Sequence, residues 1–154
     1  MKKFIISIDA GTTSNRSILF DLKGKPIFSS QKEFTQYFPK SGWVEHDADE
    51  IWRTTIKTLK DVIKKVKKLK GKVLCIGITN QRETTVLWDK KTGKPVYKAI
   101  VWQDRRQEEF CKKLRKQNKD TMIFNKTGLL IDSYFSGTKI KWILDNVPKS
   151  RQLM

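Results

Sequence analysis

The chain has 154 residues, of which 38% are hydrophobic and 32% charged, and it carries a formal net charge of +17. This length and balance predict one globular domain, and they exclude collagen-like, low-complexity and membrane-embedded classes, because Gly and Pro are few and no apolar run is long enough to span a bilayer. The basic excess would attract nucleic acid, so a basic binding module is one interpretation, but lysine outnumbers arginine and lacks the fork geometry of base recognition.

The first part of the chain predicts three antiparallel strands. Residues 4–9 are β-branched or aromatic up to Asp9, residues 17–20 form a second apolar run, and a third strand covers 26–34. The segment between the first two strands is therefore a tight turn that contains Gly11 and a row of hydroxyl side chains.

A loop over 37–43 leads into an amphipathic helix predicted from residue 51 to 69. Asp47 is the expected N-cap, with Glu50 completing a capping-box pair, and Gly71 is expected to end the helix. Its buried stripe is expected to contain Trp52, Ile56, Leu59, Val62, Ile63, Val66 and Leu69. The lysines between these positions are expected to face water: Lys57, Lys60, Lys64, Lys65, Lys67 and Lys68.

The next predicted strand, 73–79, is apolar throughout, with polar residues 80–83 directly after it. The carboxyl end of such a strand is where open α/β sheets bind ligands. A hairpin of 84–88 with 96–102 follows, and then helices over about 105–117, 119–126 and 136–146. Strands that alternate with helices predict an α/β fold with a mixed sheet and flanking helices, and the lack of a final strand suggests an incomplete domain.

The turn after the first strand has the chemistry of an anion site. Gly11 allows close backbone approach, and Asp9 could hold Mg²⁺ directly or through water. The groups that could meet phosphate oxygens are Thr12, Thr13, Ser14 and Arg16. From spacing alone, an ordinary hairpin turn rich in small residues is an equally good interpretation.

A second group of residues suits a polyol. Arg82 and Glu83 offer donors and a charged acceptor side by side, and Trp102 and Tyr134 could supply an apolar wall and a hydroxyl. Taken alone, however, the first pair is more often a surface ion pair, and the two aromatic residues are more often core.

Few other residues suggest chemistry. His46 is the only histidine, which excludes a site built from several histidines, and Cys75 and Cys111 lack the spacing of metal ligands. Unpaired thiols and the absence of a signal peptide point to the cytoplasm. The pair Arg105 and Arg106 could bind phosphate, although salt bridges, such as those to Glu108 or Glu109, are commoner.

Five ordered segments together resemble one family, the glycerol kinases, which belong to the FGGY carbohydrate kinases. The matching segments are 9–16, 42–47, 77–85, 99–106 and 127–139. The resemblance implies a ribonuclease H-like, actin/Hsp70 ATPase-type fold with two domains that close over ATP. Residues 1–154 would be a truncated amino-terminal domain, without the carboxyl-terminal one.

The resemblance also implies roles. Asp9 would assist Mg²⁺, and the four turn residues from Thr12 to Arg16 named above would meet the ATP phosphates. Arg82, Glu83 and Tyr134 would bind the glycerol hydroxyls, and Trp102 would stack along the carbons. The reaction implied is ATP-dependent phosphorylation of glycerol to sn-glycerol 3-phosphate. The partners implied are glycerol, ATP or ADP, the missing domain and further copies of the full-length protein, with no specific nucleic acid and no membrane span.

Two departures qualify this expectation. Many glycerol kinases have Gln where this chain has Ala10, and the family's general base and adenosine-binding glycines lie beyond residue 154. The isolated chain is therefore expected to be inactive. Alternatives are another FGGY sugar or polyol kinase, such as a xylulokinase or gluconokinase, and an inactive remnant of a decayed or split gene.

Overall fold

The computed structural model describes all residues from 1 to 154, and its internal contacts divide the chain into two compact units. The first unit contains residues 1–35 and 47–81, and the second contains residues 36–46 and 82–154. The chain length alone predicted one domain. Each unit is described separately below.

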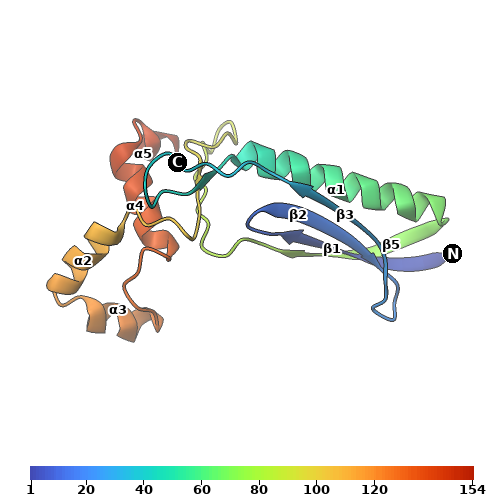
Figure 1. Ribbon diagram of the computed structural model, residues 1–154, viewed down its shortest axis with the longest axis horizontal. Coiled ribbons are helices and arrows are strands. Elements are labelled where there is room, and N and C mark those ends of the chain that lie inside the picture. The colour runs from blue at the N-terminus through green and yellow to red at the C-terminus, as the bar shows by residue number, and fades with distance from the viewer. The chain divides into compact units, whose positions relative to one another are not determined.

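The first unit is a four-stranded mixed sheet with one long helix along it (Figure 1). The strand order is β3-β2-β1-β5, in which β1 is antiparallel to β2 and parallel to β5, and β2 is antiparallel to β3. The elements are β1 (Lys2–Ala10), β2 (Ser14–Phe20), β3 (Pro26–Glu33), α1 (Ala48–Lys68) and β5 (Gly71–Thr79). The predicted meander and long helix are confirmed, and so is the α/β class with a mixed sheet.

The core of this unit forms where α1 packs on the sheet. Alternate residues of β1 point toward the helix, which is the period of two that a strand imposes. The buried residues of this cluster are Phe4, Ile6, Ile8, Leu19, Val62 and Val66. Asp47 caps α1 as expected, because its side chain accepts a hydrogen bond from the amide of Glu50.

The predicted stripe of α1 is wrong at its amino-terminal end. Trp52 is 64% exposed, whereas Thr54 and Thr58 are buried. The Thr54 hydroxyl lies 2.7 Å from Asn15 Nδ2, and the Thr58 hydroxyl lies 2.8 Å from the Ser17 hydroxyl. Polar residues of β2 thus select polar partners on the helix, because buried polar groups need hydrogen bonds.

One further expectation needs correction. Gly71 does not end α1 but begins β5, where any side chain would collide with the Phe4 ring, since a Cβ placed on this glycine would lie 2.3 Å from a ring carbon. The strand predicted after the helix is confirmed as β5, and its residues Leu74, Ile76 and Ile78 are exposed. The physical reason is position: β5 is the edge strand of the sheet, and α1 does not cover these residues.

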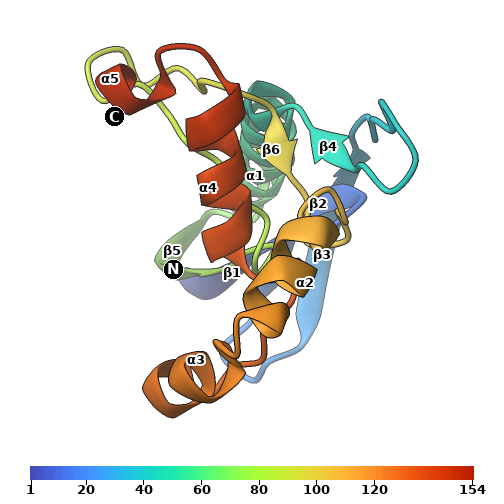
Figure 2. The same cartoon turned by 90° about the vertical axis from the view of Figure 1, so that its left-hand side faces the viewer.

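The second unit consists of a small sheet and four helices (Figure 2). The predicted hairpin is reduced to isolated bridges of Thr85 with Ile100 and of Trp88 with Pro95. Ile100 also pairs with Glu45, in the two-stranded sheet of β4 and β6. The elements are β4 (Glu45–His46), β6 (Ala99–Ile100), α2 (Glu108–Lys116), α3 (Asp120–Thr127), α4 (Ser136–Asn146) and α5 (Ser150–Leu153). The last short helix was not predicted.

Arg106 is buried within the second unit, with its side chain 1% exposed. Its guanidinium carbon is 3.8 Å from the centroid of the Trp43 ring and 4.5 Å from that of Trp142. It also forms ion pairs of 2.8 Å with both Glu45 and Asp104. Burial disfavours the cation, but the hydrogen bonds to these carboxylates outweigh that effect and raise the pKa of Arg106.

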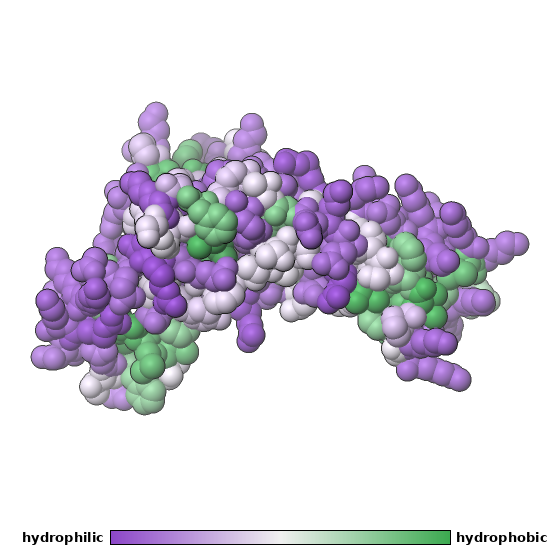
Figure 3. Space-filling model, viewed as in Figure 1, coloured by the Kyte–Doolittle hydropathy of each residue, from purple (hydrophilic) through white to green (hydrophobic).

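Hydrophilic side chains cover the outer face of α1, as the predicted lysine face requires (Figure 3). Hydrophobic side chains gather instead over α3 and the segment after it, where Met122, Phe124, Leu129 and Leu130 are exposed (Figure 3). No helix is both long enough and apolar enough to cross a membrane.

Candidate functional site

Glu83 is held in place by the amino terminus of α4. Its Oε2 accepts hydrogen bonds of 2.7 Å from both the amide and the hydroxyl of Ser136. The N-cap residue Phe135 supplies no side-chain bond, so Glu83 caps this helix from a distant segment, where the helix dipole favours a carboxylate. Glu83 Oε1 has no protein partner and remains available to a ligand.

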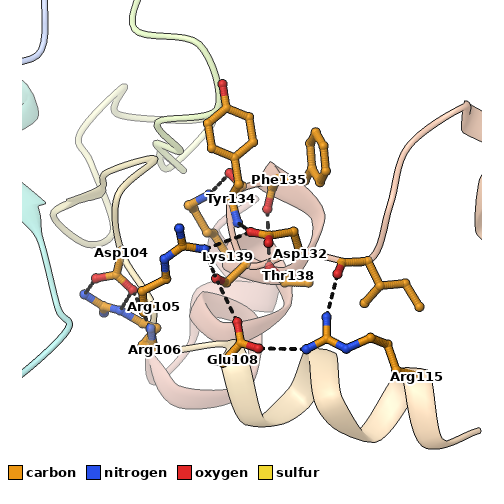
Figure 4. A network of polar contacts seen from close by, with 12 residues as sticks. Asp104, Arg105, Arg106, Glu108, Arg115, Asp132, Tyr134, Phe135, Thr138 and Lys139 are labelled. Atoms are coloured by element: carbon orange, nitrogen blue, oxygen red, sulfur yellow. Dashed lines mark hydrogen bonds and ion pairs between the residues drawn. The ribbon is translucent and has the colours of Figure 1, made fainter. Parts of the chain in front are cut away.

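The two aromatic residues of the predicted polyol group meet beside this cap. The rings of Trp102 and Tyr134 have centroids 6.0 Å apart at an edge-to-face angle of 67°, and the Trp102 amide donates to the Thr84 hydroxyl at 3.3 Å. The Tyr134 hydroxyl points away from the polar network below it (Figure 4). Glu83, Trp102 and Tyr134 are therefore brought into one neighbourhood.

Arg82 has a different status. Its side chain is exposed and forms no ion pair with Glu83 or with any other residue of the chain. The expectation that Arg82 and Glu83 form a surface ion pair is thus wrong. The guanidinium is free to bind a ligand.

Hydrogen bonds hold the backbone of Tyr134 at both its amide and its carbonyl group. Its amide donates to Asp132 Oδ1 at 2.7 Å, and its carbonyl oxygen accepts a hydrogen bond from Lys139 Nζ (Figure 4). Arg105 Nη1 in turn donates to Asp132 at 2.9 Å and to the Ser133 hydroxyl at 3.1 Å. Arg105 is thereby engaged in an ion pair, although not with the neighbouring glutamates Glu108 and Glu109 expected from the sequence.

Sequence reasoning missed Lys139, which is only 1% exposed. Burial lowers the pKa of its ammonium group to about 8, against the opposing attraction of the carboxylates of Glu83, Asp104 and Asp132. Lys139 precedes Ile143 by four positions, and residues four apart lie on one face of a helix, but this spacing alone does not mark a lysine as buried. Both are the buried residues of α4.

The predicted phosphate turn lies in the first unit, between β1 and β2. The Gly11 amide donates to the Ser14 carbonyl at 3.0 Å, and a Cβ on Gly11 would lie 2.9 Å from that oxygen, so the tight turn requires glycine here. The Ser14 hydroxyl accepts from Gln31 Nε2 at 2.8 Å, whereas Thr13 is exposed. Asp9 and Arg16 face each other across the strand pair and form an exposed ion pair of 3.1 Å.

The chain contains no cluster of three or more acidic, His or Cys side chains able to hold a metal ion. Asp9 supplies one carboxylate, and a Mg²⁺ ion held by one or two carboxylates completes its shell with water and phosphate oxygens. The exposure of Asp9, 40% of the side chain, leaves room for such a shell.

An apolar cavity of about 360 Å³ lies between α2, α3 and α4, lined mainly by Phe110, Leu114, Ile123, Leu130 and Phe135. None of the four predicted polyol residues lines it, so it is separate from the site described above.

Comparison with known proteins identifies the family of this chain. The model of the amino-terminal domain of the FGGY family of carbohydrate kinases matches residues 4–154. A glycerol kinase of Oceanobacillus iheyensis is 60% identical over 151 residues, which are 98% of this chain and 30% of that protein. A glycerol kinase of Bacillus cereus is 55% identical over 152 residues, covering 99% of this chain and 31% of the relative. The chain thus spans about 30% of the length of these curated relatives.

Solved structures agree with this result. The structure of Plasmodium falciparum glycerol kinase with ADP matches 98% of this chain and 30% of its own, with a TM-score of 0.91 and 40% identity. A gluconate kinase of Lactobacillus acidophilus matches 99% of this chain and 30% of its own, with a TM-score of 0.89 but only 22% identity, so it shares the fold alone.

Proposed function

This chain belongs to the FGGY family of carbohydrate kinases, and we propose that it forms the part of a glycerol kinase that binds glycerol and contributes to binding the ATP phosphates. The observation that carries the proposal is the Glu83 carboxylate, fixed through one oxygen by Ser136 and open through the other beside Trp102 and Tyr134. Identity favours glycerol over a sugar acid, since the glycerol kinases are 55% to 60% identical and the gluconate kinase 22%.

Each residue supplies a distinct interaction with glycerol. Glu83 Oε1 accepts a hydrogen bond from one hydroxyl, and the Arg82 guanidinium donates to a neighbouring one. The Tyr134 hydroxyl contacts a further oxygen, and the Trp102 ring packs against the carbon chain. Because Glu83 is held before the ligand arrives, little ordering entropy is lost on binding.

The turn of the first unit would meet the nucleotide. Thr12, Thr13, Ser14 and Arg16 would donate to the phosphate oxygens, and Asp9 would hold Mg²⁺, which neutralises phosphate charge when bound. Binding phosphate requires Arg16 to exchange part of its contact with Asp9 for the ligand. An exposed ion pair costs little to rearrange, because water already screens it.

The reaction would join a terminal hydroxyl oxygen of glycerol to the γ-phosphorus of ATP while the bond from that phosphorus to the β-phosphate oxygen breaks, releasing ADP. The hydroxyl proton would pass to a base, which the family resemblance places outside residues 1–154. Phosphoryl transfer depends on positioning both substrates, and this chain provides only part of that arrangement.

A chimaera tests the proposal directly. Residues 1–154 of this chain replace the 151 matching residues of the Oceanobacillus iheyensis glycerol kinase, and ADP release is measured with glycerol, gluconate and xylulose as acceptors. We expect turnover with glycerol and at most trace turnover with the others. The 154-residue chain alone should show none. A folded chimaera that prefers another acceptor, or that is inactive with glycerol, would refute the proposal.

We also propose the cytoplasm as the compartment of the protein. The two cysteines, exposed Cys75 and buried Cys111, are both unpaired, which is typical of a reducing environment. Labelling both thiols under denaturing conditions, in freshly lysed cells without added reductant, tests this. Denaturation exposes the buried Cys111, so protection of either thiol would show oxidation and contradict the proposal.

A further inference from the structure

We propose that Ser136 and Lys139, three positions apart in the first turn of α4, are positioning residues that set the geometry of the glycerol pocket. This inference rests on the proposed function, because it takes Glu83 and Tyr134 to be the residues that contact glycerol. Neither Ser136 nor Lys139 is assigned a contact with the substrate.

The spacing of the two residues places them on the same side of the helix. Positions i and i+3 are neighbours on a helix surface. Ser136 binds Glu83 Oε2 through both its amide and its hydroxyl. Lys139 binds the carbonyl oxygen of Tyr134, as Figure 4 shows. One helical turn therefore holds two pocket residues that belong to separate segments of the chain.

The bonds restrict what each pocket residue can do. Two donors on one carboxylate oxygen hold Oε2 of Glu83 in place and leave Oε1 without a protein donor. Tyr134 is held at its amide by Asp132 and at its carbonyl by Lys139, so its ring keeps its place against Trp102 and Phe135.

Packing alone does not explain a lysine at position 139. Removing an ammonium group from water is costly, and an apolar side chain of similar length often packs at least as stably. Four charged groups face it from three segments: Glu83, Asp104 and Asp132 favour its charge, and Arg105 opposes it. The buried cation thus balances carboxylates beside the pocket, which gives it an electrostatic as well as a geometric effect.

The first test is Lys139→Met in the chimaera described above, with Lys141→Met as the matched control. Lys141 lies on the same helix but forms an exposed pair with Asp145. We expect Lys139→Met to raise the KM for glycerol about 10-fold with the KM for ATP unchanged, because a charge-assisted hydrogen bond is lost. Lys141→Met should change neither. An unchanged KM for glycerol in folded Lys139→Met would overturn the role of Lys139.

A second pair of variants addresses Ser136. Ser136→Ala removes one of the two donors to Glu83 and should raise the KM for glycerol about 3- to 10-fold. Ser136→Thr keeps the hydroxyl and should have the KM of the unmodified chimaera. If the alanine variant behaves like the unmodified chimaera, the role of Ser136 is refuted.

Two measurements separate positioning from mere stability. Urea unfolding should show that Lys139→Met is no less stable than the unmodified chimaera although its KM is raised; a KM that rises only as stability falls would contradict the proposal. The KM for glycerol of the unmodified chimaera should rise above pH 8 as Lys139 loses its proton, and this readout remains if the methionine variant does not fold. A chimaera without glycerol activity would instead refute the proposed function itself.

Discussion

Glu83 and Ser136 stand 53 positions apart in the chain and are joined by two hydrogen bonds of 2.7 Å that end on a single carboxylate oxygen. Glu83 adopts a left-handed backbone conformation with φ of 64°, which is uncommon for a residue other than glycine. The hydrogen bonds by which the Glu83 side chain caps α4 offset the strain of this conformation. One residue therefore both completes a helix and presents a free oxygen to the candidate pocket.

Glu83→Ala should affect stability and binding separately. Loss of the cap should lower the free energy of unfolding by about 1 kcal/mol, and loss of the acceptor should weaken glycerol binding by about 1–3 kcal/mol. Urea unfolding and the KM for glycerol of the chimaera measure the two effects. Glu83→Gln retains an acceptor for Ser136, so it should recover most of the stability; equal losses in both variants would contradict the capping role.

Arg106→Met should be strongly destabilising. Removing the guanidinium leaves Glu45 and Asp104 as buried, unpaired carboxylates, which typically costs about 3–5 kcal/mol. Urea unfolding followed by tryptophan fluorescence reports on this unit, because Trp43 and Trp142 flank the arginine. The neighbouring Arg105→Met, which removes an exposed ion pair, should cost about 1 kcal/mol or less. A comparable loss in both variants would refute the central role of Arg106.

The stability of the chain should depend on the protonation of Lys139. Its pKa falls from 10.5 to about 8 on folding. Between these values the unfolded chain binds more protons than the folded one, so the free energy of unfolding should rise as pH increases from 8 to 10.5. At about 1.4 kcal/mol per pKa unit, the rise is on the order of 3–4 kcal/mol at most. The free energy of unfolding of Lys139→Met should lack this rise. If the free energies of unfolding of the two proteins change in parallel between pH 7 and 10, the prediction is wrong.

Asp9→Asn should separate catalysis from stability. Its ion pair with Arg16 is exposed, so unfolding should change by no more than about 0.5 kcal/mol. In the chimaera, kcat should fall about 10- to 100-fold because a charged ligand for the metal is lost, with the KM for glycerol unchanged. The exposed Asp120→Asn serves as control, and a normal kcat at saturating Mg²⁺ in Asp9→Asn would argue against the metal role.

The sequence predicted elements well where hydrophobic period and capping agree. Residues 4–9 alternate toward one buried face, and Asp47 starts α1 as expected. The errors arise where the partner surface decides the outcome. Trp52 is exposed and Thr58 buried because the facing part of β2 presents Ser17, which no pattern within α1 reveals.

The same limit applies to the candidate site. The sequence placed Glu83, Trp102 and Tyr134 in one group, and the structure brings them together, although their roles remain proposals. It missed Lys139, because a lysine in a lysine-rich chain reads as solvated unless the surrounding carboxylates and carbonyl are known. Likewise, the apolar sequence of β5 does not reveal its place in the sheet, and only the strand order shows it to be an edge.

That edge has a practical consequence for anyone who expresses residues 1–154 alone. The outer side of β5 presents unpaired backbone groups, and its side chains include Ile78, which is 73% exposed. A long apolar edge without proline is a template for intermolecular strand pairing and for the growth of aggregates. Ile78→Lys, a gatekeeper charge of the kind found on natural edge strands, is therefore the first substitution to make when the purified chain precipitates.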